Sequence, residues 1–391
     1  MNSPIVEIND PAKLESLRLP WRMLLGQTRR ATFFQSLDWL QTYWRHFGAD
    51  QKLRVLVAYH DGRPAGIMPM CVRREKTRAG FVRCLTYPLS DWGSFYGPIG
   101  PNPTIMLRRA MAYLHGRPRD WDLLDPRWID NDGIDHGRTE NAMRAAGFHP
   151  MKQLWAASPE TGFRQGWSDY WHSRDARWRK NVRRLERRLD ESGEVEYLRY
   201  RPEGQSTGDE DPRWDLYDEC VTIAARSWQG SSATGTTLSH ASVCEFLRDA
   251  HAAAAALGAV DVNLLRINER PVAFVYNYHF DGRLFGLRMG YDPEFSRFGP
   301  GTVLVRRLIE DSCRRGDESW DMGCGYPDVK RPWATHIRRS YRFTAFAANS
   351  PAAQLLRLKR YWTAARFGQA YLAGEKHPLL EERRPVGRAV G

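Results

Sequence analysis

The stretch Gly290–Leu308, which reads GYDPEFSRFGPGTVLVRRL, decides the predicted fold. A strand is expected to end at its first residue and a helix to begin at Thr302, where four apolar residues fall on one side: Val303, Leu304, Val305 and Leu308. The loop between them carries Arg297, Gly299 and Gly301. Glycines at a strand-to-helix junction let backbone N–H groups approach a phosphate, and the helix start adds partial positive charge. The stretch predicts a diphosphate-binding loop, with an ordinary Gly/Pro turn as the alternative.

A hairpin and a third strand precede this loop. In Val260–Phe280, two apolar runs flank the polar turn that begins at Asn268. Asp281-Gly282 then leads into another apolar run, Arg283–Gly290. Short polar turns between apolar runs are typical of antiparallel hairpins. The C-terminal half therefore predicts three consecutive strands, the Gly/Pro loop and a helix.

The N-terminal half repeats this order of elements. A hairpin is predicted in Leu53–Arg74 around Asp61-Gly62, and a strand, a Gly/Pro loop and a helix follow it: Phe81–Tyr87, Gly97–Pro101 and Thr104–Leu114. Both halves then reach a Trp-Asp pair, Trp121-Asp122 in the first and Trp320-Asp321 in the second. Five elements in one order indicate an internal duplication.

The composition excludes several classes of protein. The chain has 391 residues, a formal net charge of +12 and 42% hydrophobic residues, which is too apolar for a disordered chain. Eight of the 58 basic residues are Lys, so Arg dominates. The excess of Arg has two possible explanations: recognition of a phosphate-rich partner, or the codon bias of a GC-rich genome. The six cysteines show no zinc or redox spacing, and His240 and His336 lack a third ligand, so no metal is expected. The N-terminus has no apolar signal segment, and a cytoplasmic location is expected.

At this point the sequence resembles the GNAT superfamily of acyl-CoA N-acyltransferases. The branch it looks like is the CelD-like, or BioF2-like, one, which is related to the Fem-type peptidyltransferases with two GNAT units in one chain. The matching segments are Phe34–Trp39, Tyr43-Trp44, Ser227–Gly230, Glu269–Ala273, Gly290–Pro293, Gly299–Thr302, Trp320–Gly323 and Tyr326–Trp333. The resemblance covers roughly residues 30–345.

The resemblance implies an α/β fold of two tandem GNAT-like units, with mixed, mostly antiparallel sheets flanked by helices. We expect a degenerate unit at residues 1–160, an acyl-CoA-binding unit at 161–350 and a basic helical tail at 351–391. The superfamily motif is Gln/Arg-x-x-Gly-x-Gly/Ala. Gly299 and Gly301 fit it, but Ser296 stands where the motif has Gln or Arg, and Arg297 is displaced by one position.

The resemblance also implies the chemistry, in which an amine attacks the thioester directly. The expected co-substrate is acetyl-CoA or another acyl-CoA, held by Arg297, Gly299, Gly301 and Thr302. Asp321 ends a strand beside the expected cleft and is the candidate general base, and Tyr326 is the candidate acid for the departing thiolate. A structural Asp and an ordinary half-buried Tyr are the alternatives.

Three further residues are candidates for binding the amine acceptor. Trp228 and Gln229 follow a predicted helix and could line the acceptor pocket, although Trp228 could instead belong to the core. Lys330 could contact CoA phosphates or an anionic acceptor, or could be merely solvated charge. The expected acceptor is a small molecule such as a sugar, a polyamine or an amino-acid-like amine, and the chain has no apolar run long enough to span a membrane.

An Arg-rich segment leaves other functions open. Ser173–Leu189 predicts a helix capped by Ser173, with one apolar stripe and Arg on its other faces. Such a face could hold tRNA, so the alternative function is Fem-type, aminoacyl-tRNA-dependent transfer to a cell-wall or protein acceptor. A third possibility is a nucleic-acid-binding protein without enzymatic activity, which would need exposed aromatic residues among the basic ones.

Overall fold

Three two-residue turns set the frame of the sheet. Asp61-Gly62, Asn268-Glu269 and Asp281-Gly282 all have positive φ at both positions, between 48° and 75°. This backbone matches the right-handed twist of the strands that it joins. The three hairpins that the sequence predicts are therefore confirmed.

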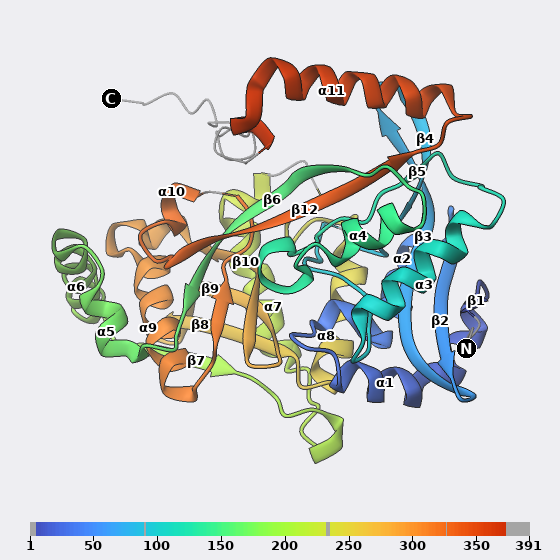
Figure 1. Ribbon diagram of the computed structural model, residues 1–391. Helices are drawn as coiled ribbons and strands as arrows, with labels where there is room; N and C mark the ends of the chain where they lie inside the picture. Colours follow the sequence, from blue (N-terminus) through green and yellow to red (C-terminus); the bar gives the residue numbers. More distant parts are fainter. Residues whose placement is uncertain (1–4, 90, 232–234, 326, 373–391) are drawn as a thin grey trace.

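This computed structural model describes residues 5–89, 91–231, 235–325 and 327–372, and within them the strands form one mixed sheet flanked by helices (Figure 1). The strand order is β1-β2-β3-β4-β5-β12-β6-β11-β10-β9-β8-β7. Most neighbours are antiparallel, and two pairs, β4 with β5 and β10 with β11, are parallel. The strands are β1 (Ile5–Ile8), β2 (Gln51–His60), β3 (Arg63–Thr77), β4 (Gly80–Thr86), β5 (Leu123–Leu124), β6 (Met151–Gly162), β7 (Val195–Tyr200), β8 (Val260–Ile267), β9 (Arg270–Phe280), β10 (Arg283–Tyr291), β11 (Ser319–Asp321) and β12 (His336–Phe346).

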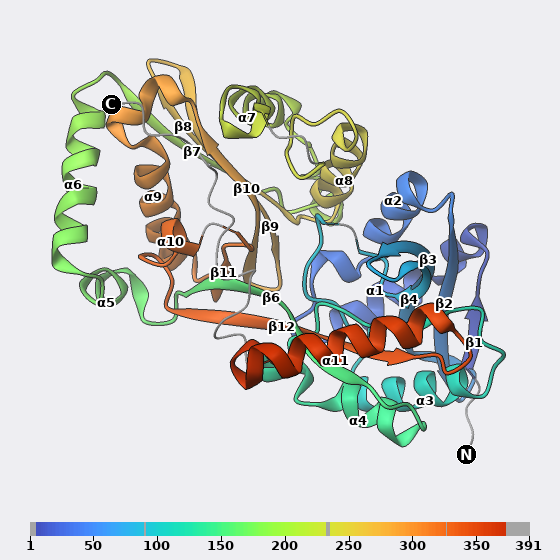
Figure 2. The same cartoon turned by 90° about the horizontal axis from the view of Figure 1, so that it is seen from above.

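The helices lie on both faces of the sheet. In the second half, α9, with α5 and α6 beside it, covers one face of β7–β10, and α7 and α8 cover the other (Figure 2). In the first half, Val55 and Val57 pack with α1, while Leu56 belongs to the cluster that contains α3. The α-helices are α1 (Arg18–Gly26), α2 (Leu37–Phe47), α3 (Pro103–His115), α4 (Arg138–Ala145), α5 (Gly166–His172), α6 (Ala176–Asp190), α7 (Trp214–Arg226), α8 (Cys244–Ala256), α9 (Pro300–Arg315), α10 (Pro327–Lys330) and α11 (Pro351–Leu372).

The two halves exchange strands. β6 follows the first half in the chain but lies between β12 and β11, and β12, the last strand, pairs with both β6 and β5. These two long strands cross the middle of the molecule below α11 (Figure 1). The duplicated tandem α/β fold is thus confirmed, with one continuous sheet shared by both halves. The predicted boundary at 160/161 falls inside β6, and the division into units stays a prediction.

Aromatic side chains fill the contact between the halves. Phe34, the first residue of the Phe34–Trp39 segment, and its neighbour Phe33 pack against Tyr278 of β9, with ring centroids 5.8 and 4.6 Å away, and Phe34 also meets Phe285 of β10. Ser36 begins α2 by accepting a hydrogen bond from the Trp39 N–H. The segment resembling the start of the Fem-related family therefore builds the interface, because its large apolar residues are buried there.

One sequence-based expectation about a helix start is wrong. The cap of α6 is Asp175, whose carboxylate accepts the Trp178 N–H, while the Ser173 hydroxyl donates to the Tyr170 carbonyl. A carboxylate in this position also favours the helix start electrostatically. No helix of the described residues is long and apolar enough to cross a membrane.

A buried carboxylate, Asp125, joins the first half to the exchanged strand β12. Its oxygens accept hydrogen bonds from Arg127 Nε at 2.7 Å, Arg342 Nε at 3.0 Å and Thr344 Oγ1 at 2.6 Å. The Asp125 side chain is fully buried, and the arginines hold its pKa far below the usual range despite the burial. Asp125 thus exists as a carboxylate at the seam of the two halves.

We predict that Asp125→Ala lowers the free energy of unfolding by about 3 kcal/mol or more, because it leaves buried guanidinium groups without their partner. Urea denaturation followed by circular dichroism measures this change. The matched control is Asp218→Ala, which removes an exposed ion pair with Arg248 and should cost less than about 1 kcal/mol. Equal losses in the two variants would contradict this account of the seam.

Candidate active site

The parallel strands β10 and β11 separate after a short ladder. They pair at Arg283–Phe285 and Ser319–Asp321, and the pairing does not continue beyond Asp321 among the described residues. β10 then carries an irregularity between Gly286 and Arg288 in its pairing with β9. The ladder between the two strands therefore ends at Asp321, beside the place where the resemblance puts the cleft.

Glycines let the two chains stay in close contact just after the ladder ends. A Cβ on Gly286 would lie 2.9 Å from the Asp321 carbonyl oxygen, and a Cβ on Gly323 would lie 2.8 Å from the Gly286 carbonyl oxygen. Gly323 also has a positive φ of 73°. A larger residue at either position would push the strand ends apart.

Asp321 lies at this point of divergence and is buried. Its carboxylate accepts the Ser158 hydroxyl at 3.2 Å and the Gly323 N–H at 2.8 Å. Burial raises the pKa of the Asp321 carboxyl to about 6, with Glu160 adding to the rise and Arg338 opposing it. A carboxyl group with a pKa this close to neutrality can both take up and release a proton at physiological pH.

The strand exchange supplies the surroundings of Asp321. Ser158 and Glu160 belong to β6, and Arg338 belongs to β12. Arg338 binds Asp130 through Nη2 at 2.7 Å and reaches Glu160 at 3.3 Å. These residues could not be predicted from the sequence, because nothing in the local sequence shows that β6 crosses into the second half.

Lys330 is the second buried titratable group at this place. Its ammonium group donates to the Gly323 carbonyl at 2.9 Å and to the Cys324 carbonyl at 3.2 Å. Burial lowers the pKa of Lys330 to about 8. Lys330 therefore holds the segment that follows β11 rather than pointing into solvent.

Register shows which residues of the duplication correspond. The Glu318 N–H bonds the Gly282 carbonyl in the second half, and the Asp122 N–H bonds the Arg83 carbonyl in the first. Two steps further along each ladder, Leu85 pairs with Leu124 in the first half and Leu284 pairs with Trp320 in the second. The next residue is Asp125 in one half and Asp321 in the other. The two Trp-Asp pairs are thus not equivalent, and predicting that they are is wrong: Asp321 corresponds to Asp125, which lies three residues after Asp122.

The predicted cofactor residues lie at the start of α9. Gly299 has φ 62° and accepts the N–H groups of Thr302 and Val303 through its carbonyl oxygen. A Cβ on Gly301 would meet only the Tyr291 ring, at 3.4 Å, so space remains beside it. Arg297 is exposed, with its guanidinium 4.6 Å from the centre of the Phe298 ring.

The predicted acceptor residues are split between core and surface. Gln229 is buried, and its side-chain amide donates to the Met289 carbonyl of β10 at 3.1 Å. Trp228 is 48% exposed and so does not belong to the core. Tyr326, the predicted acid, lies outside the described residues. Within those residues no group of three or more His, Cys, Asp or Glu side chains could hold a metal ion.

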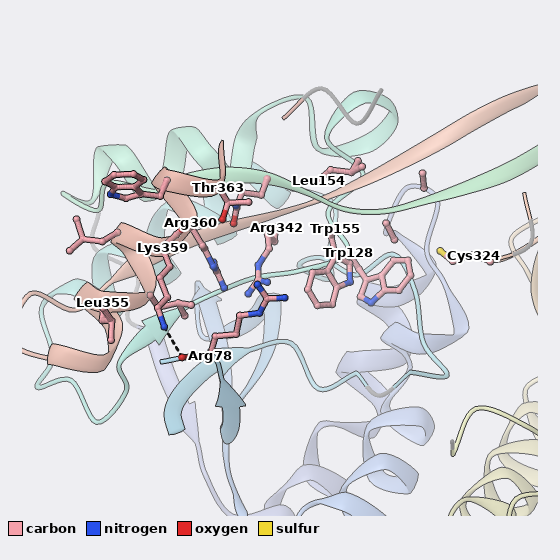
Figure 3. Close-up of a pocket in the computed structure, with 17 residues that line it drawn as sticks. Arg78, Trp128, Leu154, Trp155, Cys324, Arg342, Leu355, Lys359, Arg360 and Thr363 are labelled. Atoms are coloured by element: carbon pink, nitrogen blue, oxygen red, sulfur yellow. Dashed lines mark hydrogen bonds between the residues drawn. The ribbon is translucent and has the colours of Figure 1, made fainter. Parts of the chain in front are cut away.

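A cavity of about 1120 Å³ begins beside this site. It is lined by Cys324 and Gly325, three and four residues after the end of β11, and continues between β6, β12 and α11 (Figure 3). Trp128 and Trp155 form part of its wall. The cavity gives a ligand of considerable size a route to the residues that follow Asp321.

The comparisons with known proteins agree with the fold. Residues 176–331 match the family described as acetyltransferase (GNAT) domain. This part of the chain is a GNAT domain. It contains Asp321, Lys330 and the start of α9, whereas β6 and β12 lie outside the matched residues. A search of curated proteins found no match to the chain.

Solved structures share the fold over nearly the whole chain. FemX has a TM-score of 0.59 at 11% identity and covers 90% of this chain and 99% of its own. A conserved protein of unknown function from Bacteroides thetaiotaomicron scores 0.50 at 14% identity, covering 88% of this chain and 100% of its own. L-PGS from Bacillus licheniformis scores 0.50 at 13% identity, covering 90% and 96%. The GNAT acyltransferase fold is therefore established, and the CelD-like branch stays a prediction.

The near-neutral carboxyl of Asp321 predicts a pH-dependent stability. Because its pKa is above the ordinary value of 3.8, the folded chain holds this proton more tightly than the unfolded chain. The associated stability is present at low pH and is lost as the pH rises through about 6. Asp321→Asn, which resembles the protonated form, should stabilise the protein by about 3 kcal/mol at pH 8 and by less at pH 5.

Thermal unfolding of both proteins at pH 5 and pH 8 measures this effect. Asp328→Asn on α10, at an exposed carboxylate, is the control and should show no such pH dependence. A gain from Asp321→Asn that is the same at both pH values would show that Asp321 is not a buried, titrating group.

Proposed function

We propose that the chain is an N-acyltransferase that moves an acyl group, acetyl in the simplest case, from acyl-CoA to an amine of a sugar, polyamine or amino-acid-like acceptor. The observation that carries this proposal is the position of Asp321, buried at the point where β10 and β11 separate in a GNAT domain. An amine with a pKa near 10 is mostly protonated at pH 7, so it must lose a proton for its nitrogen to attack, and a base beside it provides a place for that proton.

The start of α9 is suited to the diphosphate of CoA. Gly301 leaves open space, Arg297 is exposed, and the helix start contributes partial positive charge. Arg297, Gly299, Gly301 and Thr302 are the residues that would hold the cofactor. Acyl-CoA, when bound, supplies an activated thioester carbonyl.

The protein's own groups would move the protons. As the C–N bond forms and the C–S bond breaks, Asp321 takes the proton from the amine nitrogen. The thiolate that leaves needs a proton in return. Tyr326 stays the donor predicted from the sequence, and Lys330, with its pKa lowered to about 8, is a second candidate within the described residues.

A specific surface keeps the tRNA-dependent alternative open. α6 lies against α9, with Leu185 next to Gly299, and Glu186 binds Arg306. Six of its basic residues are exposed and have no carboxylate within 4.0 Å among the described residues: Arg177, Lys180, Arg183, Arg184, Arg187 and Arg188. Such a face beside the proposed cofactor site suits a polyanion such as tRNA, with transfer to a cell-wall or protein acceptor. Protection from thermal unfolding by acetyl-CoA supports the first function, and loss of activity after ribonuclease treatment supports the second.

We predict that Gly301→Glu abolishes acyl-CoA binding, because a carboxylate then fills the space at the helix start and repels the diphosphate. The folded chain should tolerate the change, since a Cβ here makes only ordinary contact with Tyr291. Calorimetric titration with acetyl-CoA measures it. Gly26→Glu, at an open position at the end of α1, is the control. Unchanged affinity in Gly301→Glu would exclude this cofactor site.

We further predict that Asp321→Asn lowers the acyl-transfer rate by about 100-fold or more at pH 7 and by less at pH 9, where more of the amine has already lost its proton. In the unmodified protein the rate should fall below pH 6 as Asp321 takes up a proton. Asp122→Asn, in the Trp-Asp pair of the first half, serves as the control. An equal loss at both pH values would remove Asp321 as the base.

A further inference from the structure

The cavity beside the candidate site has an uncovered apolar wall. Leu355, Leu358 and Trp362 of α11 are 46%, 54% and 77% exposed, and all three line the cavity. Leu154 and Trp155 line the opposite wall on β6 (Figure 3). The volume of about 1120 Å³ exceeds that of most drug-sized ligand sites. The apolar side chains therefore face a space large enough for an extended ligand.

Cationic side chains gather at the end of the cavity under α11. The side chains of Arg78, Arg342 and Arg360 extend toward one another from three different elements: the β3–β4 turn, β12 and α11 (Figure 3). Lys359 binds the carbonyl oxygen of Arg78 through Nζ at 2.8 Å and tethers α11 to that turn. Three guanidinium groups that converge in one space repel one another, and Asp125 beside them offsets only part of their positive charge.

The carboxylates of this region do not balance these charges. Arg342 is paired with Asp125, which also binds Arg127. Arg78 and Arg360 have no carboxylate within 4.0 Å in the part of the chain that the structure describes. Arg360 donates to Thr344 Oγ1 at 2.7 Å, and burial, together with Arg342, lowers its pKa to about 10. An oxyanion placed here would supply the missing negative charge.

The two ends of the cavity thus differ in chemistry. Cys324 and Gly325 line it near Asp321, and Arg78 and Arg360 line it under α11. Between them, Trp155 lies with its ring 4.8 Å from the guanidinium carbons of both Arg127 and Arg342. A planar guanidinium binds a carboxylate or a phosphate through two parallel hydrogen bonds. The cavity is therefore suited to a long molecule that is apolar in its middle and anionic at its far end.

We propose that this cavity binds the acyl acceptor and that the acceptor is an amphipathic amine with a carboxylate or phosphate at the opposite end. Its oxyanion would lie on Arg78 and Arg360, its apolar middle against Trp155 and α11, and its amine beside Cys324. The placement of the amine rests on the function proposed above. The binding of an amphipathic oxyanion does not depend on it.

The test separates binding from acyl transfer. Calorimetric titration without acyl-CoA compares 10-aminodecanoate, decyl phosphate and 10-aminodecan-1-ol, which lacks the anion. We expect 10-aminodecanoate and decyl phosphate to bind at least about ten-fold more tightly than 10-aminodecan-1-ol. The hydroxyl of the alcohol cannot make the charge-assisted hydrogen bond that an oxyanion makes with a guanidinium group. Arg78→Gln and Arg360→Gln should each weaken anion binding by a similar factor. Arg78 lies in an exposed turn, so its variant should fold normally even if the variant of the half-buried Arg360 does not.

Arg357→Gln is the matched control, because Arg357 lies on the same helix, is exposed and does not line the cavity. Equal affinity for anion and alcohol, or anion binding that is unchanged in Arg78→Gln and Arg360→Gln, would overturn the proposed cavity. Acyl transfer to 10-aminodecanoate is then measured with acetyl-CoA. Anion-dependent binding without transfer to any amine would leave the cavity in place and count against the proposed acyltransferase function instead.

Discussion

The antiparallel pairing of β6 with β12 is the constraint on which the rest of the structure depends. Each of these strands is the last in its own half and lies next to the short central strand of the other half. Backbone groups in a sheet need partners, so each half leaves an edge unpaired until the other half supplies a strand. The exchange therefore gives one continuous sheet, and it brings Ser158 of the first half to the Asp321 carboxylate of the second.

Asp125 and Asp321 occupy equivalent positions in the two halves, but their pKa values are shifted in opposite directions. At the end of the parallel strand in the first half, Asp125 is surrounded by arginines that hold its pKa far below the usual range. At the equivalent point in the second half, burial raises the pKa of Asp321 to about 6 and a serine hydroxyl is one of its partners. Asp125 is therefore a permanently ionised structural carboxylate of the first half, whereas Asp321 of the second half can exchange protons near neutral pH.

The sequence predicts the local elements well because their signals are local. Asp-Gly turns between apolar runs specify the hairpins, and the apolar periodicity after Gly301 specifies α9. Asp321 could be selected because the resemblance to the GNAT superfamily places the cleft beside the strand that it ends. Its partners could not, since pairing between β6 and β12 joins residues far apart in the chain. The two Trp-Asp pairs suggest an equivalence for a related reason. Their residue types are the same, but the hydrogen-bonded register of the strands places them at different positions in the two halves.

The exchange of strands also determines the order in which the protein can be completed during synthesis. β6 leaves the ribosome long before β12 has been made, and at ordinary elongation rates the delay is roughly ten seconds or more. Throughout that interval one of its edges has no permanent partner, and such an edge can pair with any other extended chain. The nascent first half therefore needs protection, by a chaperone or by a provisional contact of its own, until the last strand of the sheet arrives.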